Sequence, residues 1–101
     1  MNYIGYDKNG EKLQLGDICK YTITNSDTKE TNEYRGMIVY DDSEFAFMFE
    51  QPNDDFPLVF MNLVNVGTIE RLTNIFSLTK DFPEYEKWVE IYKSNKEIGL
   101  V

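Results

Sequence analysis

Carboxylates are the side chains of this 101-residue chain whose spacing suggests chemistry. Asp41, Asp42 and Glu44 crowd one turn, and Asp54 and Asp55 crowd another. Two such turns can hold a hydrated Mg²⁺ or Ca²⁺ weakly, but the residue pattern of an EF-hand loop is absent. Solvated charge is the commoner role of acidic turns. The sequence therefore predicts no metal or other cofactor and ranks a metal-dependent hydrolase last.

Residue types needed for most other catalysis are missing. The chain contains no histidine, which removes Ser-His and Cys-His catalysis, most zinc sites and the usual proton shuttle at neutral pH. Its single cysteine, Cys19, alternates with Tyr21 and Ile23 and is predicted to be a buried apolar side chain. No nucleophile elbow, P-loop or dinucleotide fingerprint is present. We therefore predict that the protein is not an enzyme.

The net charge of −8 is concentrated in the middle of the chain. Residues 1–35 hold six acids and five bases, residues 36–70 hold seven acids and no base, and residues 71–101 hold five of each. Such a field repels nucleic-acid phosphate and favours basic partners. Carboxylates on a small scaffold can imitate the phosphates of DNA, although the same charge also aids solubility. The predicted partner-binding residues are Asp41, Asp42, Glu44, Glu50, Asp54 and Asp55.

Aromatic residues and lysines support a rival function. Aromatic strands beside Lys and Arg form base-stacking platforms on small barrels. Phe45, Phe47 and Phe49, however, lie in the base-free segment and share one face at period two, which favours a core role. A separate basic patch could come from the N-terminal lysines Lys8, Lys12, Lys20 and Lys29. Direct nucleic-acid binding is therefore disfavoured and kept as the alternative.

The chain divides into a β region at residues 1–78 and one helix within residues 79–101, which together form a single domain. Strands are predicted at residues 18–24, 34–40, 45–49 and 67–76, and residues 58–64 are strand or irregular. Ile69 and Leu72 break the alternation of the last strand, as a β-bulge would. Turns are predicted at residues 7–10 and 41–44, with a loop at residues 25–32.

The helix has both a start signal and an apolar stripe. Asp81 is its predicted N-cap, Glu84 completes a capping box, and Pro83 fits the first turn. The apolar stripe consists of Tyr85, Trp88, Val89 and Tyr92. A helix this short needs tertiary packing, so we expect it to dock on the β region through Trp88. The alternative is that Trp88 and Tyr92 form the interface of a homodimer.

These elements predict a mainly β, α+β fold: a small SH3-like five-stranded barrel or a bent antiparallel sheet, with one C-terminal amphipathic helix. The lone cysteine suits a reducing cytoplasm, and no secretory leader is recognised. The most apolar stretch, at residues 56–66, is far shorter than a membrane span.

Three segments carry a family resemblance: YIGYDKNGEKLQLGDICKY at residues 3–21, YRGMIVYDDSEFAFMF at 34–49 and TIERLTNIFSL at 68–78. They resemble the C-terminal half of YopX-like proteins, which are small proteins of bacteriophages and prophages of Gram-positive bacteria. The matching residues of the first segment are Gly5, Asp7, Lys8, Asn9, Gly10, Gly16, Asp17 and Ile18. The chain departs from the family in lacking its usual N-terminal portion and in carrying the C-terminal helix. The resemblance implies a β-barrel-like domain of mobile-element origin and supplies no catalytic residues.

Charge and resemblance together lead to one expected function. We expect a non-enzymatic phage or prophage accessory protein that binds a host protein with a basic surface in the host cytoplasm. Its concrete form is an acidic inhibitor of a host nucleic-acid enzyme or defence complex, of an anti-CRISPR, DNA-mimic type. The alternative is an SH3-like nucleic-acid-binding module.

Overall fold

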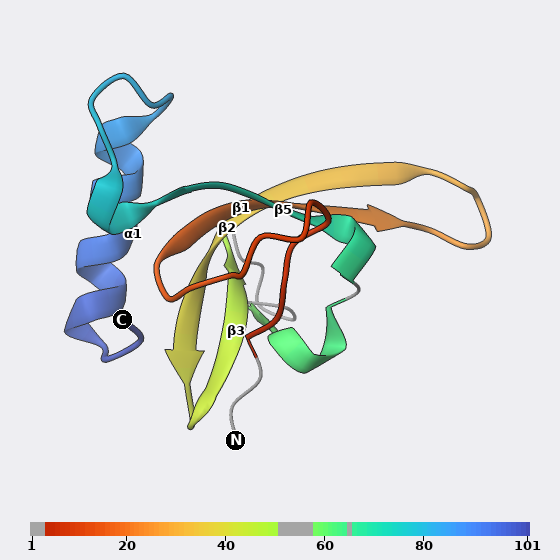
Figure 1. Ribbon diagram of the computed structural model, residues 1–101, viewed down its shortest axis with the longest axis horizontal. Coiled ribbons are helices and arrows are strands. Elements are labelled where there is room, and N and C mark those ends of the chain that lie inside the picture. The colour runs from red at the N-terminus through yellow and green to blue at the C-terminus, as the bar shows by residue number, and fades with distance from the viewer. Residues whose placement is uncertain (1–3, 51–57, 65) are drawn as a thin grey trace.

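The computed structural model describes residues 4–50, 58–64 and 66–101, and five strands within them form one antiparallel sheet in the order β4-β3-β2-β1-β5 (Figure 1). The strands are β1 (Asp17–Thr24), β2 (Thr31–Asp41), β3 (Glu44–Phe49), β4 (Leu58–Phe60) and β5 (Ile69–Asn74). Three 3₁₀ helices, η1 (Met61–Leu63), η2 (Val66–Thr68) and η3 (Ile75–Ser77), precede helix α1 (Tyr85–Glu97). Because β4 and β5 form opposite edges, the sheet does not close. The mainly β fold with a C-terminal helix is confirmed, in its open-sheet form.

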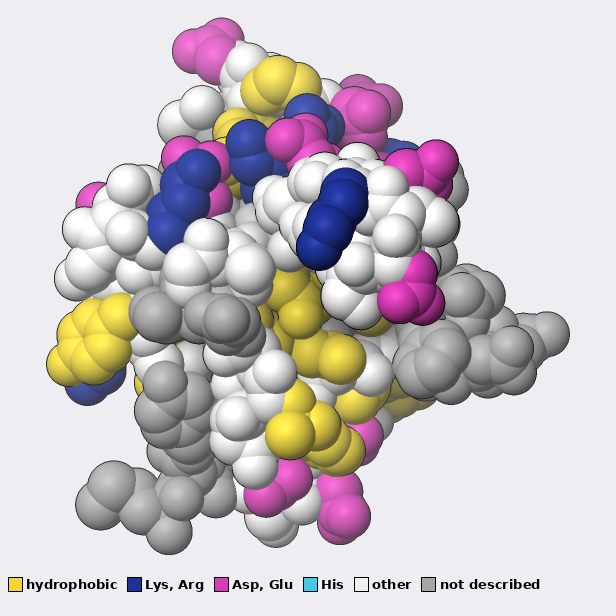
Figure 2. All heavy atoms as spheres, turned by 90° about the vertical axis from the view of Figure 1, so that its right-hand side faces the viewer, with side chains coloured by type: hydrophobic (Ala, Val, Ile, Leu, Met, Phe, Trp, Pro, Cys, Tyr) yellow, Lys and Arg dark blue, Asp and Glu magenta, His cyan; other side chains and the backbone are white. Residues whose placement is uncertain are grey.

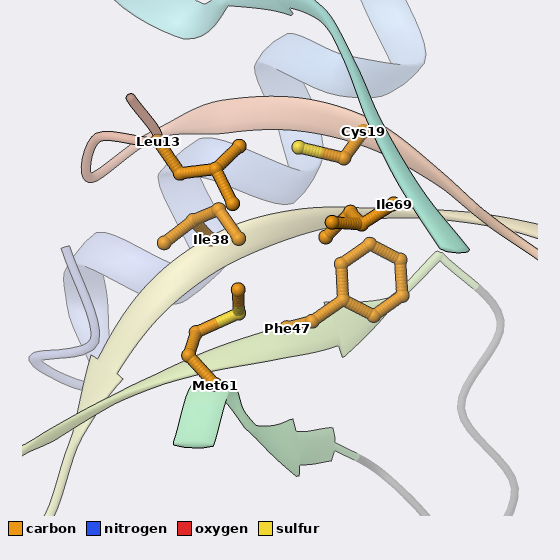
Figure 3. Close-up of a cluster of buried hydrophobic side chains, with 6 residues drawn as sticks. All are labelled: Leu13, Cys19, Ile38, Phe47, Met61 and Ile69. Carbon is orange, nitrogen blue, oxygen red and sulfur yellow. The ribbon is translucent and has the colours of Figure 1, made fainter. Parts of the chain in front are cut away.

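The sheet carries a buried core on each face, and successive side chains of a strand contribute alternately to the two cores. The loop-side core contains Leu13, Cys19, Ile38, Phe47, Met61 and Ile69, which point toward a common centre in Figure 3. The helix-side core contains Ile18, Met37, Val39, Ala46 and Trp88. Phe45 and Phe49 pack on the loop-side core beside Phe47, so the predicted shared face of the three rings is confirmed, as is the burial of Cys19.

The β1–β2 hairpin extends beyond the rest of the sheet (Figure 1). Its ladder continues to the pair Thr24 and Thr31, whereas the pairing of β2 with β3 stops at Gly36 and that of β1 with β5 stops at Tyr21. The outer part is therefore a two-stranded arm, and Ile23 and Tyr34 are among its exposed side chains.

The predicted bulge in the last strand is confirmed. Cys19 pairs with Arg71 while its neighbour Ile18 pairs with Thr73, so Leu72 is the extra residue of β5. A bulge of this kind bends the edge strand and redirects the side chains beside it.

Helix α1 begins later than its sequence signals suggest. Its N-cap is Glu84, in the left-handed region at φ 60° and without a side-chain cap, so the predicted cap at Asp81 is wrong. A helix capped at Asp81 would need Phe82 to be helical, and a residue that precedes proline disfavours that conformation. The chain instead makes a turn here, in which the Tyr85 N–H donates to the Phe82 carbonyl at 3.1 Å.

The helix also buries a different stripe from the predicted one. Trp88 is fully buried in the helix-side core, which confirms the predicted docking residue, and Ile91 and Tyr92 pack around it. Asn95 is buried one turn further on, with its Nδ2 4.0 Å from Met37 Sδ. The predicted stripe members Tyr85 and Val89 are half-buried and belong to neither core.

Asp17 is a fully buried carboxylate that joins the start of β1 to β5. Its Oδ1 accepts hydrogen bonds from Arg71 Nε at 2.9 Å and Asn74 Nδ2 at 2.8 Å. Its Oδ2 accepts from the Gln14 N–H at 2.7 Å. Buried charge is tolerated when it is paired and hydrogen-bonded in this way, so Asp17 is an architectural residue.

Asp7 places the N-terminal loop along the outer edge of β5. It accepts backbone N–H bonds from Asn9 at 2.9 Å, Glu11 at 2.8 Å and Arg71 at 3.1 Å. The neighbouring Lys8 N–H donates to the Ile69 carbonyl at 2.8 Å. The edge of β5 is thus partly covered, which opposes the addition of a foreign strand. Burial raises the pKa of Asp7, but the bonds to Arg71, Glu11 and Asn9 outweigh it and hold the pKa below its ordinary value of 3.8.

Replacement of Gly36 by alanine should damage the sheet. A Cβ at this position would overlap the Met48 carbonyl oxygen and lie 2.6 Å from Phe47 Cζ. We expect Gly36→Ala to lower the free energy of unfolding by about 3 kcal/mol in urea denaturation. The control is Gly10→Ala, which meets no atom within 4 Å but has φ +82° and should cost about 1–2 kcal/mol. Equal losses in the two variants would contradict the clash.

Replacement of Asp7 by alanine should destabilise the protein in a pH-dependent way. The loss of three charge-assisted bonds should cost about 3 kcal/mol at pH 7, measured by urea denaturation. Because the folded-state pKa is depressed, the carboxylate stabilises the fold above pH 3.8, and this contribution is lost as the pH falls through the lower folded-state pKa. The gap between wild type and variant should therefore narrow toward pH 3. As a control, replacement of the exposed Asp27 by alanine should leave the free energy of unfolding unchanged. If the stability difference between wild type and Asp7→Ala stays the same at low pH, the role of Asp7 is packing and not charge.

Candidate functional site

Three predicted site residues come together at the β2–β3 turn, which we call the acidic end: Asp41, Asp42 and Glu44. Asp42 and Ser43 form the two-residue turn with φ 48° and 67°, and Asp41 pairs directly with Glu44 across the ladder. Figure 2 shows acidic side chains at the lower end of the molecule, where Figure 1 places this turn. Like charges directly opposite each other on paired strands are destabilising. The local fold therefore tolerates a repulsion at this turn.

The acidic end gathers three neighbouring carboxylates that have no compensating partner in the described part of the chain. Within the described ranges, none of its three side chains forms an ion pair or a side-chain hydrogen bond. Asp42 and Glu44 are exposed and Asp41 is half-buried. This turn therefore presents uncompensated negative charge to solvent.

Glu50 lies at the other end of β3 and has a cationic partner. Its carboxylate pairs with Lys87 of α1, and its side chain is only 15% exposed. The hydrogen bond to Glu50 raises the pKa of Lys87, which also pairs with Glu84 at 3.5 Å. Glu50 thus connects the sheet to the helix, and the structure does not bring it together with the acidic end. Two other predicted site residues, Asp54 and Asp55, lie outside the described residues.

The lysines of the rival basic patch are partly neutralised. Lys8 and Lys20 both pair with Glu70, at 3.8 and 3.4 Å, and Lys20 also lies 3.8 Å from Glu33. Lys29 lies away from them in the turn of the β1–β2 arm. Two of the four lysines therefore already form ion pairs within the protein.

A groove of about 480 Å³ runs between the end of β3 and α1. Met48, Phe49 and Ile91 supply its apolar lining, and the pair of Glu50 and Lys87 borders it. Within the described residues no group of three or more His, Cys, Asp or Glu side chains could hold a metal ion. The groove has the character of an apolar contact surface.

The buried carboxylates Asp7 and Asp17 were not singled out from the sequence as a pair. Both lie in short turn signals, Asp-Lys-Asn-Gly and Gly-Asp, and that context is the signal for structural carboxylates that accept backbone N–H bonds. They also affect Cys19, because burial first and then the charges of Asp17 and Asp7 raise the pKa of its thiol. Cys19 therefore stays protonated and is a poor nucleophile.

In the described part of the chain, no helix is both long and apolar enough to cross a membrane. Comparison of the chain with family models, with curated proteins and with solved structures finds no match.

Proposed function

We propose that the protein acts without catalysis, by binding another protein through the acidic end. The observation that carries the proposal is that three carboxylates without partners in the described ranges meet at one two-residue turn. Asp17 and Glu50 are satisfied by partners within the fold, whereas Asp41, Asp42 and Glu44 have none among the described residues. Charge that the fold leaves uncompensated, and even repulsive across a ladder, is available to a cationic partner.

The partner proposed is a protein with a basic surface. The net charge of −8 steers such a partner toward the protein and repels nucleic acid. A nucleic-acid-binding groove of a host enzyme or defence complex has this character, so the concrete form of the proposal is a phage or prophage inhibitor that imitates DNA charge. The mobile-element origin in this proposal rests on the YopX-like resemblance of residues 3–21, 34–49 and 68–78.

The acidic end is tested by charge reversal in a pull-down from a Gram-positive host lysate. We expect wild type to retain a partner that the triple variant Asp41→Lys, Asp42→Lys, Glu44→Lys loses. The matched control changes three exposed acids elsewhere by the same charge: Asp27→Lys, Glu30→Lys and Glu97→Lys. For the purified protein and its purified partner, the affinity should fall about ten-fold or more between low and physiological salt. Retention of the partner by the acidic-end variant, or salt-insensitive affinity, would refute this surface.

The nucleic-acid alternative has a separate test. Since Glu70 already engages Lys8 and Lys20, we expect no gel shift of DNA or RNA even at low salt. A shift that is abolished by Lys12→Glu and Lys29→Glu would favour the alternative.

A further inference from the structure

Helix α1 carries a second apolar face that its own sheet does not use. Tyr85, Val89 and Tyr92 follow one another at i, i+4 and i+7, so they lie on one side of the helix. Tyr85 and Val89 belong to neither core, and Tyr92 lies at the border, where its ring meets Phe76 edge-to-face at a centroid distance of 5.6 Å. Phe76 is 67% exposed. We call these four residues the Val89 face.

Glu86 and Lys93 flank the Val89 face toward opposite ends of the helix, with Glu90 between them. Glu86 lies in the first turn, and Lys93 lies two turns later on the same side, at i+7. Lys96 extends the line of Tyr85, Val89 and Tyr92 toward the C-terminus. In the described part of the chain, Glu86 and Lys96 form no ion pair, and Lys93 has only a solvent-exposed contact with Glu90 at 3.8 Å, which is a weak one.

We propose that the Val89 face binds the same face of a second copy, with the two α1 helices antiparallel about a two-fold axis near Glu90. In that arrangement, residues at about the same distance from the axis, to within one residue, lie near each other. Glu86 then meets the partner's Lys93, Val89 meets the partner's Tyr92, and Lys96 passes over the ring of the partner's Tyr85. A two-fold interface forms each of these contacts twice.

The charge pattern selects a second copy in this orientation. A parallel pair would place Glu86 opposite its own equivalent and align the two helix dipoles, both of which are unfavourable. The antiparallel pair brings Glu86 near the partner's Lys93 twice and keeps Val89 and Tyr92 near the middle, and these contacts have to outweigh the approach of the two Glu90 carboxylates at the axis. Figure 1 shows α1 at the outside of the molecule, beyond the sheet, where a second helix can approach it.

The interface is small, so the dimer should form only at high concentration. A 13-residue helix is about 20 Å long, and with Phe76 it offers less area than the roughly 1,200 Å² of a stable complex. We expect a dissociation constant in the high micromolar range. The dimer is independent of the proposed function, since it uses a different surface from the acidic end.

Sedimentation velocity on the full chain at about 10 µM to 1 mM and low salt tests the dimer. Wild type should shift from monomer to dimer across this range. Glu86→Lys and Lys93→Glu should each weaken association about ten-fold, because each places like charges opposite each other. The double variant, Glu86→Lys with Lys93→Glu, should restore association because the charges are exchanged and remain complementary. Circular dichroism checks that each variant is folded, since both changes oppose the helix dipole.

Two further variants separate the Val89 face from general charge effects. Val89→Glu should abolish association, because it replaces the central apolar contact by two carboxylates that add to the Glu90 pair at the axis, on a half-buried site that the cores do not use. Glu30→Lys, the matched control for Glu86→Lys on the distant arm, should leave association unchanged. The proposal is overturned by a monomer at about 1 mM, by failure of the exchanged pair to restore association, or by an equal loss in Glu30→Lys. The proposal is also overturned if the protein stays monomeric and its Val89 face binds a helix of another protein.

Discussion

The buried carboxylate of Asp17 is the interaction on which the other elements depend. It holds Arg71 and Asn74 of β5 against the start of β1. Asn74 in turn accepts the Phe76 N–H, and Gly16 accepts the Ile75 N–H, so the same junction sets the direction of η3. Because η3 leads the chain toward α1, the helix docks where this network directs it. Loss of one partner would leave buried charge uncompensated, which costs more than an intact buried pair contributes.

The central parts of β1, β2, β3 and β5 were predictable because their signals are local, whereas the β4 segment was left open and the ends of β2 and β5 were misplaced. The alternation around Cys19 and the three Phe of β3 reflects faces that the sheet does bury. Whether the sheet closes depends on pairing between its first and last strands, and no local pattern specifies that. The start of α1 depends on Phe82, which lies before a proline. A capping-box pattern read without that restriction places the helix too early.

The candidate site was only partly predictable, because ion pairs connect residues that are distant in sequence. The base-free segment obtains its cations from outside: Glu50 from α1, and Glu70 from the N-terminal loop and β1. Counting charges along the chain cannot reveal these pairs. The Asp41–Glu44 hairpin was predictable as a cluster because its members are neighbours in sequence, and a two-residue turn keeps them together.

Backbone hydrogen bonds connect the acidic end to α1, although the two lie on different parts of the surface. The Tyr40 N–H, one residue before the acidic end, donates to the Leu100 carbonyl at 2.7 Å, and the Leu100 N–H donates to the Asn95 carbonyl at 2.8 Å. The segment after α1 thus supports the strand that carries the acidic end. Two copies joined through α1 would present two such ends at a fixed separation. A partner with an extended basic groove could then engage both, and the second contact would form at a high effective concentration. Weak association through α1 is therefore sufficient if the partner binds both copies at once, because each contact then stabilises the other.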